Sequence, residues 1–572
     1  MSEVWGSNIK APYATNAFFQ NMVVGSGFLP IDVTPYLARI ERGSQGLGIC
    51  WNTKDEVTSG NVTTTFDLDW AITPHSGIFN SHNVVRRDEL SVTVKSNFRN
   101  GSMTFPLVRG SAFISVIVDS LSPILYTPRG IENVTTANDT EVTKFGSSDK
   151  FVVTLNNGDT WVLYLSENAK ILRTSNQLRF QGKLSGIIRL AYIGKDESNL
   201  PVYEKFKDAV PVSTSLYYFI SQPYGYIKFK FNCVSLSGAN KTKDALMFAL
   251  PHHMDSLYQP NVQNVTFKTV MGTYTAIAKN YWYLKEELIL TTWQHKGLPF
   301  SYNFLELEEK SFVGDFMKET YEKDIEYYTD PELTAEFTVY DLGVQVNRLA
   351  RLALIGDWLS DLECAEKARD AIKRLLIPWL ENTNENLLYY DQVYGGIITD
   401  LEVSDWIESS VNSQYDIHHH EYGYLIYAAA VVGKEDSDFL DQYKDQILEL
   451  VRDYANPYSD DPYFPLTRNK DWFRGHSWSR GLGEYADNRN EESISESINS
   501  YYAVSLLGVA MNDERLKNWG SLLAATELRS AKKYWQMPDD SVYPDTFAKN
   551  RMVGTLWTTK VDYRTYFGSY VD

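Results

Sequence analysis

The chain has 572 residues, of which 43% are hydrophobic and 22% are charged, which is the usual composition of a folded globular protein. This length predicts two or three domains, because single hydrophobic cores stop growing at about 250–300 residues. The formal net charge of −19 argues against a nucleic-acid partner, since phosphate binding depends on Lys and Arg. No apolar run approaches the length needed to cross a bilayer, so we expect no membrane partner.

The first residues and the cysteines bear on the compartment. The start of the chain, MSEVWGSNIKAPYATNAFF, has neither the basic nor the apolar segment of a secretory signal. We therefore expect a cytoplasmic protein or a processed extracellular or cell-wall protein. Cys50, Cys233 and Cys364 are too far apart in sequence to suggest a disulfide framework or a zinc site, so we expect free thiols.

Residues 1 to about 250 predict strands. Alternating apolar and polar residues recur in segments such as LSVTVKS, FVVTLN, TWVLYLS and YIKFKFN, separated by turn signals such as Asn157-Gly158. This spacing predicts an antiparallel β-sandwich, to which we assign residues 1–255.

The pattern changes in the second half of the chain. Residues 256–328 mix short strands with charged segments and predict a small α/β connector domain. From Pro331 onward the apolar residues recur at helical spacing, as in SDFLDQYKDQILELVRDYA. Residues 329–572 are therefore predicted to form a helical domain.

A pair of carboxylates marks the candidate site. Glu492 and Glu496 are four positions apart and lead into INSYYAVSLLGVAM, which has helical spacing, so on a helix both would project from one face. Like charges at this spacing repel, which raises the pKa of one partner in a dry site. The plain alternative is a solvated acidic helix start, which the helix dipole favours. The residues just upstream, Asp471, Trp472, His476 and Trp478, favour a site that holds sugar hydroxyls and stacks sugar rings on indoles.

These segments carry a family resemblance. Two segments closely resemble the signature of glycoside hydrolase family 81, whose members are endo-1,3-β-glucanases: RNKDWFRGHSWSRGL and ADNRNEESISESINSYYA. The family signature reads roughly RNFDWYAGHSWASGL…ADGKNQESSSEAVNAYYA. Further matches are TNAFFQNM (15–22), ALPHHMDSL (249–257), NRLARLALIGDWL (347–359), QVYGGIITD (392–400), HEYGYLIYAAAVVG (420–433) and VGTLWTTKVDYRTYFG (553–568).

The resemblance implies an architecture. It consists of an N-terminal antiparallel β-sandwich, a small α/β domain and a C-terminal (α/α)6-type barrel. Family members continue past VDYRTYFG with further helices, whereas this sequence stops at Asp572, so we expect an incomplete barrel.

One family motif is altered in this chain. It reads YNDHHFHYGY, in which the Asp resembles a general acid that the His four residues later supports. The matching segment is YDIHHHEYGY, so Ile417 stands at the Asp position and Glu421 at the His position. Three interpretations remain open: Asp416 takes the acid role after a local backbone shift, Glu421 takes it from one helical turn away, or the acid is lost. Loss of a general acid typically costs about 10²–10⁴ in rate without abolishing binding.

The histidine run at 418–420 raises the question of a metal. Successive positions on a helix point about 100° apart, so three adjacent histidines cannot all converge on one ion. We predict no metal site, and the implied chemistry requires no cofactor.

By resemblance, the implied function is endo-hydrolysis of β-1,3-glucan with inversion, by a monomer. An inverting enzyme needs a proton donor and a base on opposite sides of the bond, with carboxyls roughly 6.5–9.5 Å apart. Glu492 is the predicted base, and Glu496 is predicted to raise its pKa or to position the water. The predicted substrate-binding residues are Asp471, Trp472, His476, Trp478, His418, His419, Tyr422, Tyr424, Asn499 and Tyr502. The alternative is a catalytically impaired relative that binds glucan.

Overall fold

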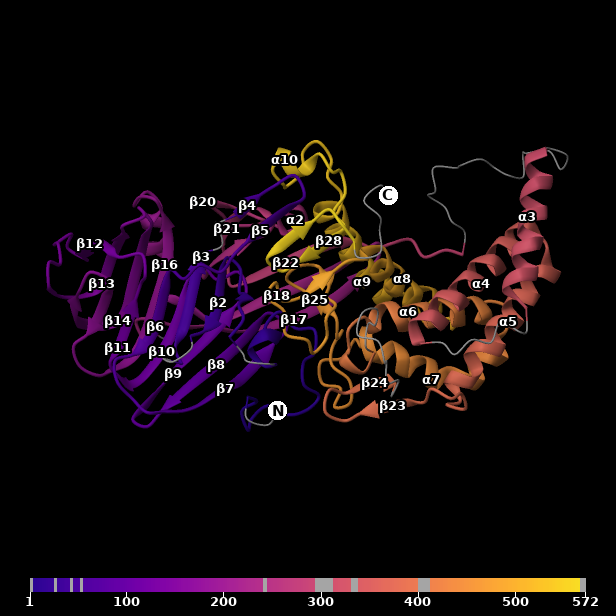
Figure 1. Ribbon diagram of the computed structural model, residues 1–572, viewed down its shortest axis with the longest axis horizontal. Helices are drawn as coiled ribbons and strands as arrows, with labels where there is room; N and C mark the ends of the chain where they lie inside the picture. Colours follow the sequence, from indigo (N-terminus) through magenta and orange to yellow (C-terminus); the bar gives the residue numbers. More distant parts are fainter. Residues whose placement is uncertain are drawn as a thin grey trace.

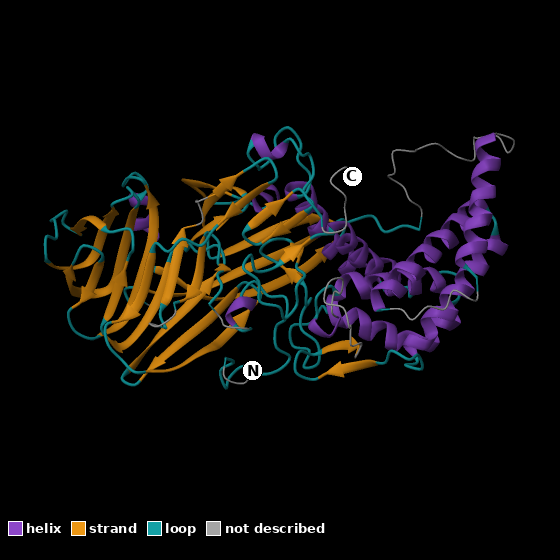
Figure 2. Ribbon diagram, viewed as in Figure 1, coloured by secondary structure: helices purple, strands orange, loops and turns teal. Residues whose placement is uncertain are grey.

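The computed structural model describes residues 4–24, 28–41, 45–51, 55–239, 244–293, 312–330, 338–399 and 412–565. Strands occupy the first half of the chain and helices most of the second half, as Figures 1 and 2 show. The predicted order of an antiparallel β part followed by a helical part is confirmed.

The largest element of the described chain is a fourteen-stranded antiparallel sheet. Its strands are β1 (Ile31–Asp32), β2 (Tyr36–Ile40), β3 (Leu47–Trp51), β6 (Trp70–Pro74), β7 (Phe79–Asp88), β8 (Ser91–Phe98), β9 (Gly101–Val108), β10 (Ile114–Leu121), β11 (Pro123–Tyr126), β12 (Ile131–Thr136), β13 (Phe145–Leu155), β14 (Thr160–Arg173), β15 (Gln177–Phe180) and β16 (Leu184–Gly194). Gly158, with φ +80°, turns the chain between β13 and β14, as the Asn-Gly pair predicted.

Alternation along β14 explains why this sheet is buried on both faces. Trp161 and Leu163 belong to one apolar core, whereas Val162 and Tyr164 belong to a second core. Because successive side chains point to opposite faces, a single strand contributes to both. The second core continues into the helical half of the chain and joins the two parts.

Smaller sheets lie between the large sheet and the helices. One contains β17 (Ala209–Ser221), β18 (Tyr224–Ser235) and β22 (Tyr281–Glu287), and another contains β19 (Leu246–Ala249), β21 (Gly272–Ala278) and β20 (Val262–Thr269). Short pairs are formed by β23 (Leu388–Asp391) with β24 (Gly396–Thr399) and by β25 (Lys470–Asp471) with β26 (His476–Ser477).

The last described strands return to the N-terminal part of the chain. A five-stranded sheet has the order β27 (Asn490–Glu491), β28 (Thr555–Trp557), β29 (Lys560–Asp562), β5 (Asn61–Thr64) and β4 (Asp55–Val57). Residues 555–557 and 560–562 were placed by sequence in the helical domain, and they form strands β28 and β29. The β5 partner of β29 lies about 500 positions away, beyond the reach of any local pattern.

Three helical hairpins build the helical part. Helices α4 (Val339–Leu359), α6 (His418–Gly433) and α8 (Ile494–Ala510) pack side by side, and each also packs on the helix that follows it: α5 (Leu362–Leu380), α7 (Ser437–Ala455) and α9 (Glu514–Tyr534). The remaining helices are α1 (Leu200–Phe206), α2 (Pro251–Ser256), α3 (Phe312–Tyr328) and α10 (Asp545–Ala548), with 3₁₀ turns at Gln20–Met22 and Asn412–Gln414.

Side-chain caps set the starts of several helices. Thr338 caps α4, and Asp361, Asp436 and Asp513 cap α5, α7 and α9 by accepting from backbone N–H groups. Among the described helices, none combines the length and the apolar character that a membrane crossing requires.

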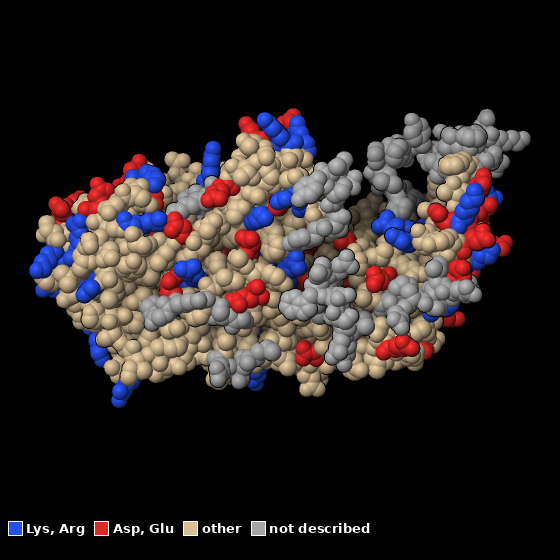
Figure 3. Space-filling model, viewed as in Figure 1, with Lys and Arg blue, Asp and Glu red and all other residues tan. Residues whose placement is uncertain are grey.

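Acidic and basic side chains are interspersed on the described surface in view in Figure 3. The net charge of −19 suits a neutral ligand better than a polyanion.

Candidate active site

The first turns of the three adjacent helices α4, α6 and α8 meet at one carboxylate. Glu496 lies in the first turn of α8, and its Oε1 accepts hydrogen bonds from the hydroxyls of Tyr340 on α4, at 3.1 Å, and Tyr424 on α6. The N-terminal end of α8 also favours a negative charge. Burial alone would raise the pKa of Glu496, but the charge of His420 and the hydrogen bonds from Tyr424, Ser493 and Tyr340 lower it. Glu496 is therefore held as an oriented carboxylate.

Glu492 does not share a helical face with Glu496, contrary to the sequence expectation. The helix begins at Ile494, and Glu492 lies in the partly exposed link between strand β27 and the cap residue Ser493. The apolar spacing that predicted the helix starts only at Ile494, so it could not locate this boundary. The two carboxylates remain neighbours in sequence, with Glu492 outside the helix.

A buried carboxylate that the sequence analysis did not select lies beside them. Glu491 is fully buried, and its two oxygens lie 3.1 Å from Nε2 of His419 and 3.1 Å from Nε2 of His420. Burial alone would raise the pKa of Glu491, but His420 and His419 hold it well below the ordinary range of a glutamate. Burial lowers the pKa of His419 to about 4, so this ring is neutral and donates from Nε2.

The geometry of His419, His420 and Glu491 is compatible with a small cation, because one donor atom from each lies within 4.8 Å of the others. A cation would need the lone pairs of both Nε2 atoms. Those nitrogens instead face the carboxylate of Glu491, to which they donate hydrogen bonds. We assign no metal here, and the predicted absence of a metal stays a prediction.

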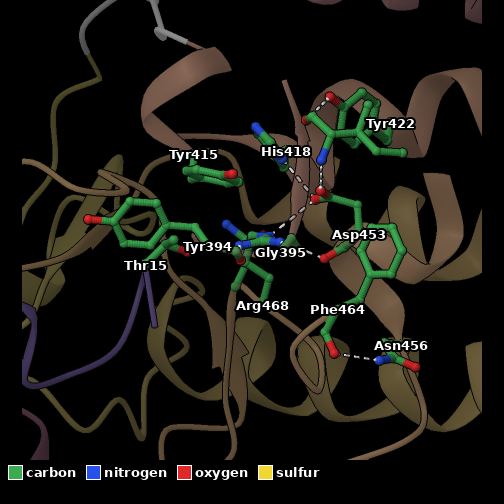
Figure 4. A network of polar contacts seen from close by, with 12 residues as sticks. Thr15, Tyr394, Gly395, Tyr415, His418, Tyr422, Asp453, Asn456, Phe464 and Arg468 are labelled. Carbon is green, nitrogen blue, oxygen red and sulfur yellow. Dashed lines mark hydrogen bonds and ion pairs between the residues drawn. The ribbon is translucent and has the colours of Figure 1, made fainter. Parts of the chain in front are cut away.

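The remaining histidine of the run, His418, belongs to a different network (Figure 4). His418 lies with Nδ1 2.8 Å from Oδ1 of Asp453 and Nε2 2.8 Å from the carbonyl oxygen of Asn412. Both partners only accept, so both ring nitrogens donate. Asp453 also pairs with Arg468 at 3.2 Å and accepts from the backbone N–H of Ile397. This buried network anchors the chain where it enters α6.

The altered motif surrounds this entry. Ile417, at the position of the family's acid, is the residue preceding α6 and offers no ionisable group. Asp416 is partly exposed, and its Oδ1 accepts from the backbone N–H of Arg480. Glu421 is 2% exposed and accepts from Nδ2 of Asn412 at 2.6 Å. Burial raises the pKa of Glu421 to about 7, so this group has the titration range of a general acid but not the access to a substrate.

Four residues predicted to hold sugar are part of the protein interior. Asp471, Trp472, His476 and Trp478 are at most 7% exposed. Asp471 pairs with Arg109 at 3.0 Å and accepts from the Trp478 indole at 2.8 Å. These four side chains are buried in this structure, and their direct contact with sugar stays a prediction.

Three predicted binding residues of α6 are also buried, and their contact with sugar likewise stays a prediction. His418, His419 and Tyr422 are fully buried, and the Tyr422 hydroxyl donates to the carbonyl oxygen of Ile397 at 2.6 Å. The motif therefore contributes buried residues that hold the start of α6 in place.

Three of the predicted binding residues remain partly exposed. Tyr424 contacts Glu496, as described, and Asn499 and Tyr502 follow along α8. The Tyr502 hydroxyl donates to the carbonyl oxygen of Thr292 at 2.7 Å, whereas Nδ2 of Asn499 has no hydrogen-bond partner. Tyr340, 156 positions before Glu496, was missed because no local signal relates it to the site.

The described chain thus joins a large antiparallel sheet to a helical part in which carboxylates, tyrosines and histidines gather near the helix N-termini. The Glycosyl hydrolase family 81 N-terminal domain matches residues 3–297, and the Glycosyl hydrolase family 81 C-terminal domain matches residues 310–572. The chain belongs to glycosyl hydrolase family 81.

Known proteins agree with this assignment. A glucan endo-1,3-beta-D-glucosidase of Glycine max is 29% identical over 99% of this chain and 82% of its own length. A glucan endo-1,3-beta-D-glucosidase of Arthroderma benhamiae is 28% identical over 82% of this chain, which corresponds to 52% of its own length. A solved family 81 glycoside hydrolase from Clostridium thermocellum shares the fold, with a TM-score of 0.85 at 19% identity, over all of this chain and 76% of that protein.

Proposed function

We propose that this protein hydrolyses internal 1,3-β-glucosidic bonds of β-glucan, with inversion at the anomeric carbon. The observation that carries the proposal is the meeting of Tyr340, Tyr424 and Glu496 near the starts of three adjacent helices, four positions along the chain from Glu492. The family membership of the protein and the names of its relatives supply the substrate class.

Glu492 is the proposed base. It is partly exposed, so a water molecule on the substrate side can reach it. Glu496 is held ionised by two tyrosine hydroxyls and a histidine. A general base removes the water proton as the water attacks the anomeric carbon.

Asp416 is the proposed acid. Of the two carboxyls beside Ile417, it is the exposed one, and the Arg480 backbone N–H fixes its orientation through Oδ1. Glu421 is buried against Asn412 and serves as the alternative donor. Asp416→Asn and Glu421→Gln, assayed side by side on laminarin, distinguish them: the larger loss of kcat identifies the donor.

The test of the function is release of reducing sugar from laminarin and curdlan, with the anomer of the first product read by NMR. An initial α-anomer from the β-linked substrate supports inversion, and an initial β-anomer contradicts it. Glu492→Gln is the matched control, because it is nearly isosteric and cannot accept the proton.

A second candidate function follows from Ile417. A chain that lost its acid keeps a glucan-binding surface, and it would be retained on curdlan without releasing sugar. Retention on curdlan with no hydrolysis over a day would favour this binding function over the enzymatic one.

A further inference from the structure

The ring of His420 lies between two carboxylates that come from different elements. Its Nε2 is 3.1 Å from Oε1 of Glu491 on β27, and its Nδ1 is 3.7 Å from Oε2 of Glu496 on α8. His420 itself is 4% exposed. The Ser497 hydroxyl, 3.3 Å from Nε2, completes its polar surroundings.

The surroundings of this ring favour an imidazolium. Nε2 lies at hydrogen-bond distance from one carboxylate, and Nδ1 lies at ion-pair distance from another, so both ring nitrogens face negative charge. The charged groups that face the ring are Glu491, Glu496 and Asp416, and the adjacent His419 is neutral. Burial alone would lower the pKa of His420, but these carboxylates raise it to about 9.

The ring and the tyrosines act on opposite oxygens of Glu496. Tyr424 and Tyr340 donate to Oε1, and the imidazolium faces Oε2. The two hydrogen bonds at Oε1 and the cationic ring at Oε2 together favour one orientation of Glu496 and its charged form.

We propose that His420 is the positioning residue for Glu496, holding it as a fixed carboxylate beside the base Glu492 through a cationic ring shared with Glu491. This inference rests on the proposed function for its catalytic consequence. His420 and Glu491 are in contact in the interior, so the two side chains form a buried pair.

The variant that tests this role is the double substitution His420→Phe with Glu491→Gln. It removes both charges together, so no unpaired buried charge destabilises the fold. Its melting temperature should stay near that of the wild type. Without the imidazolium, Glu496 takes up a proton at higher pH, so the acid limb of kcat against pH for laminarin should move up by about one unit. KM should change less than threefold, since no sugar contact is removed.

Two results in this assay would overturn the proposal. One is a double variant whose pH profile superimposes on that of the wild type. The other is a uniform loss of kcat at all pH values, because a merely structural role would lower activity without moving the limb.

A second measurement does not depend on activity. In protein labelled with ¹⁵N-histidine, the His420 signals are assigned by their loss in His420→Phe. Two protonated ring nitrogens are expected at pH 7.5, and Glu496→Gln should lower the pH at which the ring loses its proton. A neutral ring at pH 7.5, or no response to Glu496→Gln, would contradict the proposal.

A wild-type protein that releases no sugar would contradict the proposed hydrolysis instead. The NMR result would still decide the protonation state of His420.

Discussion

The hydroxyl of Tyr340 lies 3.1 Å from Oε1 of Glu496, although the two residues are 156 positions apart. The contact exists because α4, α6 and α8 pack side by side with their first turns at the same end. The geometry of the carboxylate therefore depends on the packing of three hairpins and not on one motif.

Tyr340→Phe should weaken catalysis without unfolding the protein. A hydrogen bond to a charged group is worth about 1.5–3 kcal/mol, so we expect kcat on laminarin to fall about tenfold. The pKa of Glu496 should rise, since one of the donors that lower it is gone. Tyr327→Phe on α3, at a tyrosine that is 64% exposed, is the control and should leave the rate unchanged. Equal rates for both variants would show that Tyr340 does not act on the reaction.

Glu492→Gln should remove hydrolysis while glucan binding stays within a few-fold. Gln keeps the shape of Glu but cannot accept a proton, which costs about 10²–10⁴ in rate. Glu496→Gln should have the smaller effect on the same laminarin assay, because Glu496 orients and does not accept the proton. The reverse order of effects would exchange the two roles, and full activity in both would place the site elsewhere.

Ile417→Asp combined with Glu421→His rebuilds the family's acid motif. If the missing general acid limits the reaction, the rate of laminarin hydrolysis should rise at least tenfold, since a well-placed acid contributes a factor of about 10²–10⁴ to the rate. The substitution also replaces a carboxyl whose pKa burial raises to about 7. The matched control is Glu421→His alone, which should give no increase. An unchanged rate in the double variant would mean that Asp416 or Glu421 already serves as the acid.

Asp471→Asn should destabilise the protein and leave sugar binding unchanged. It leaves the buried Arg109 without its counter-charge, which costs about 3–5 kcal/mol in unfolding free energy. Asp539→Asn, in an exposed ion pair with Arg551, is the control and should cost about 0–1 kcal/mol. Urea unfolding and curdlan retention of the folded fraction measure the two effects. A loss of binding without a loss of stability would support Asp471 as a sugar ligand.

The His420 ring should also make stability depend on pH. Its pKa rises from 6.5 in the unfolded chain to about 9 in the folded one, so the folded state holds the proton more tightly. The stabilisation is therefore complete below pH 6.5 and is lost as pH rises to about 9, by about 3 kcal/mol. Denaturant unfolding at pH 6 and pH 9.5 should show this decrease in the wild type. The decrease should be smaller in His420→Phe with Glu491→Gln, and an equal decrease in both proteins would refute the assignment.

Much of the architecture was predictable because it is local. Period-two alternation predicted the strands around Asn157-Gly158, and the helical spacing predicted the helices of the second half. The exceptions are residues 560–562, which pair with residues 61–63, and Glu492, which lies two positions before α8. Strand pairing over such distances and the first residue of a helix depend on tertiary contacts that no short window contains.

By itself, the sequence determined the family, the order of the strand and helical parts, and the segments around residues 415–424 and 468–502 that build the site. Only the tertiary structure decided which of those side chains face outward. Asp471 and Trp478 look like sugar ligands by residue type, yet Arg109, 362 positions away from Asp471, satisfies the carboxylate in the interior. Tyr340, His420 and Glu491 became parts of the site for the same reason. A charged or aromatic side chain has the same chemistry in either place, and whether it meets water, substrate or a buried partner is set by the packing of distant elements.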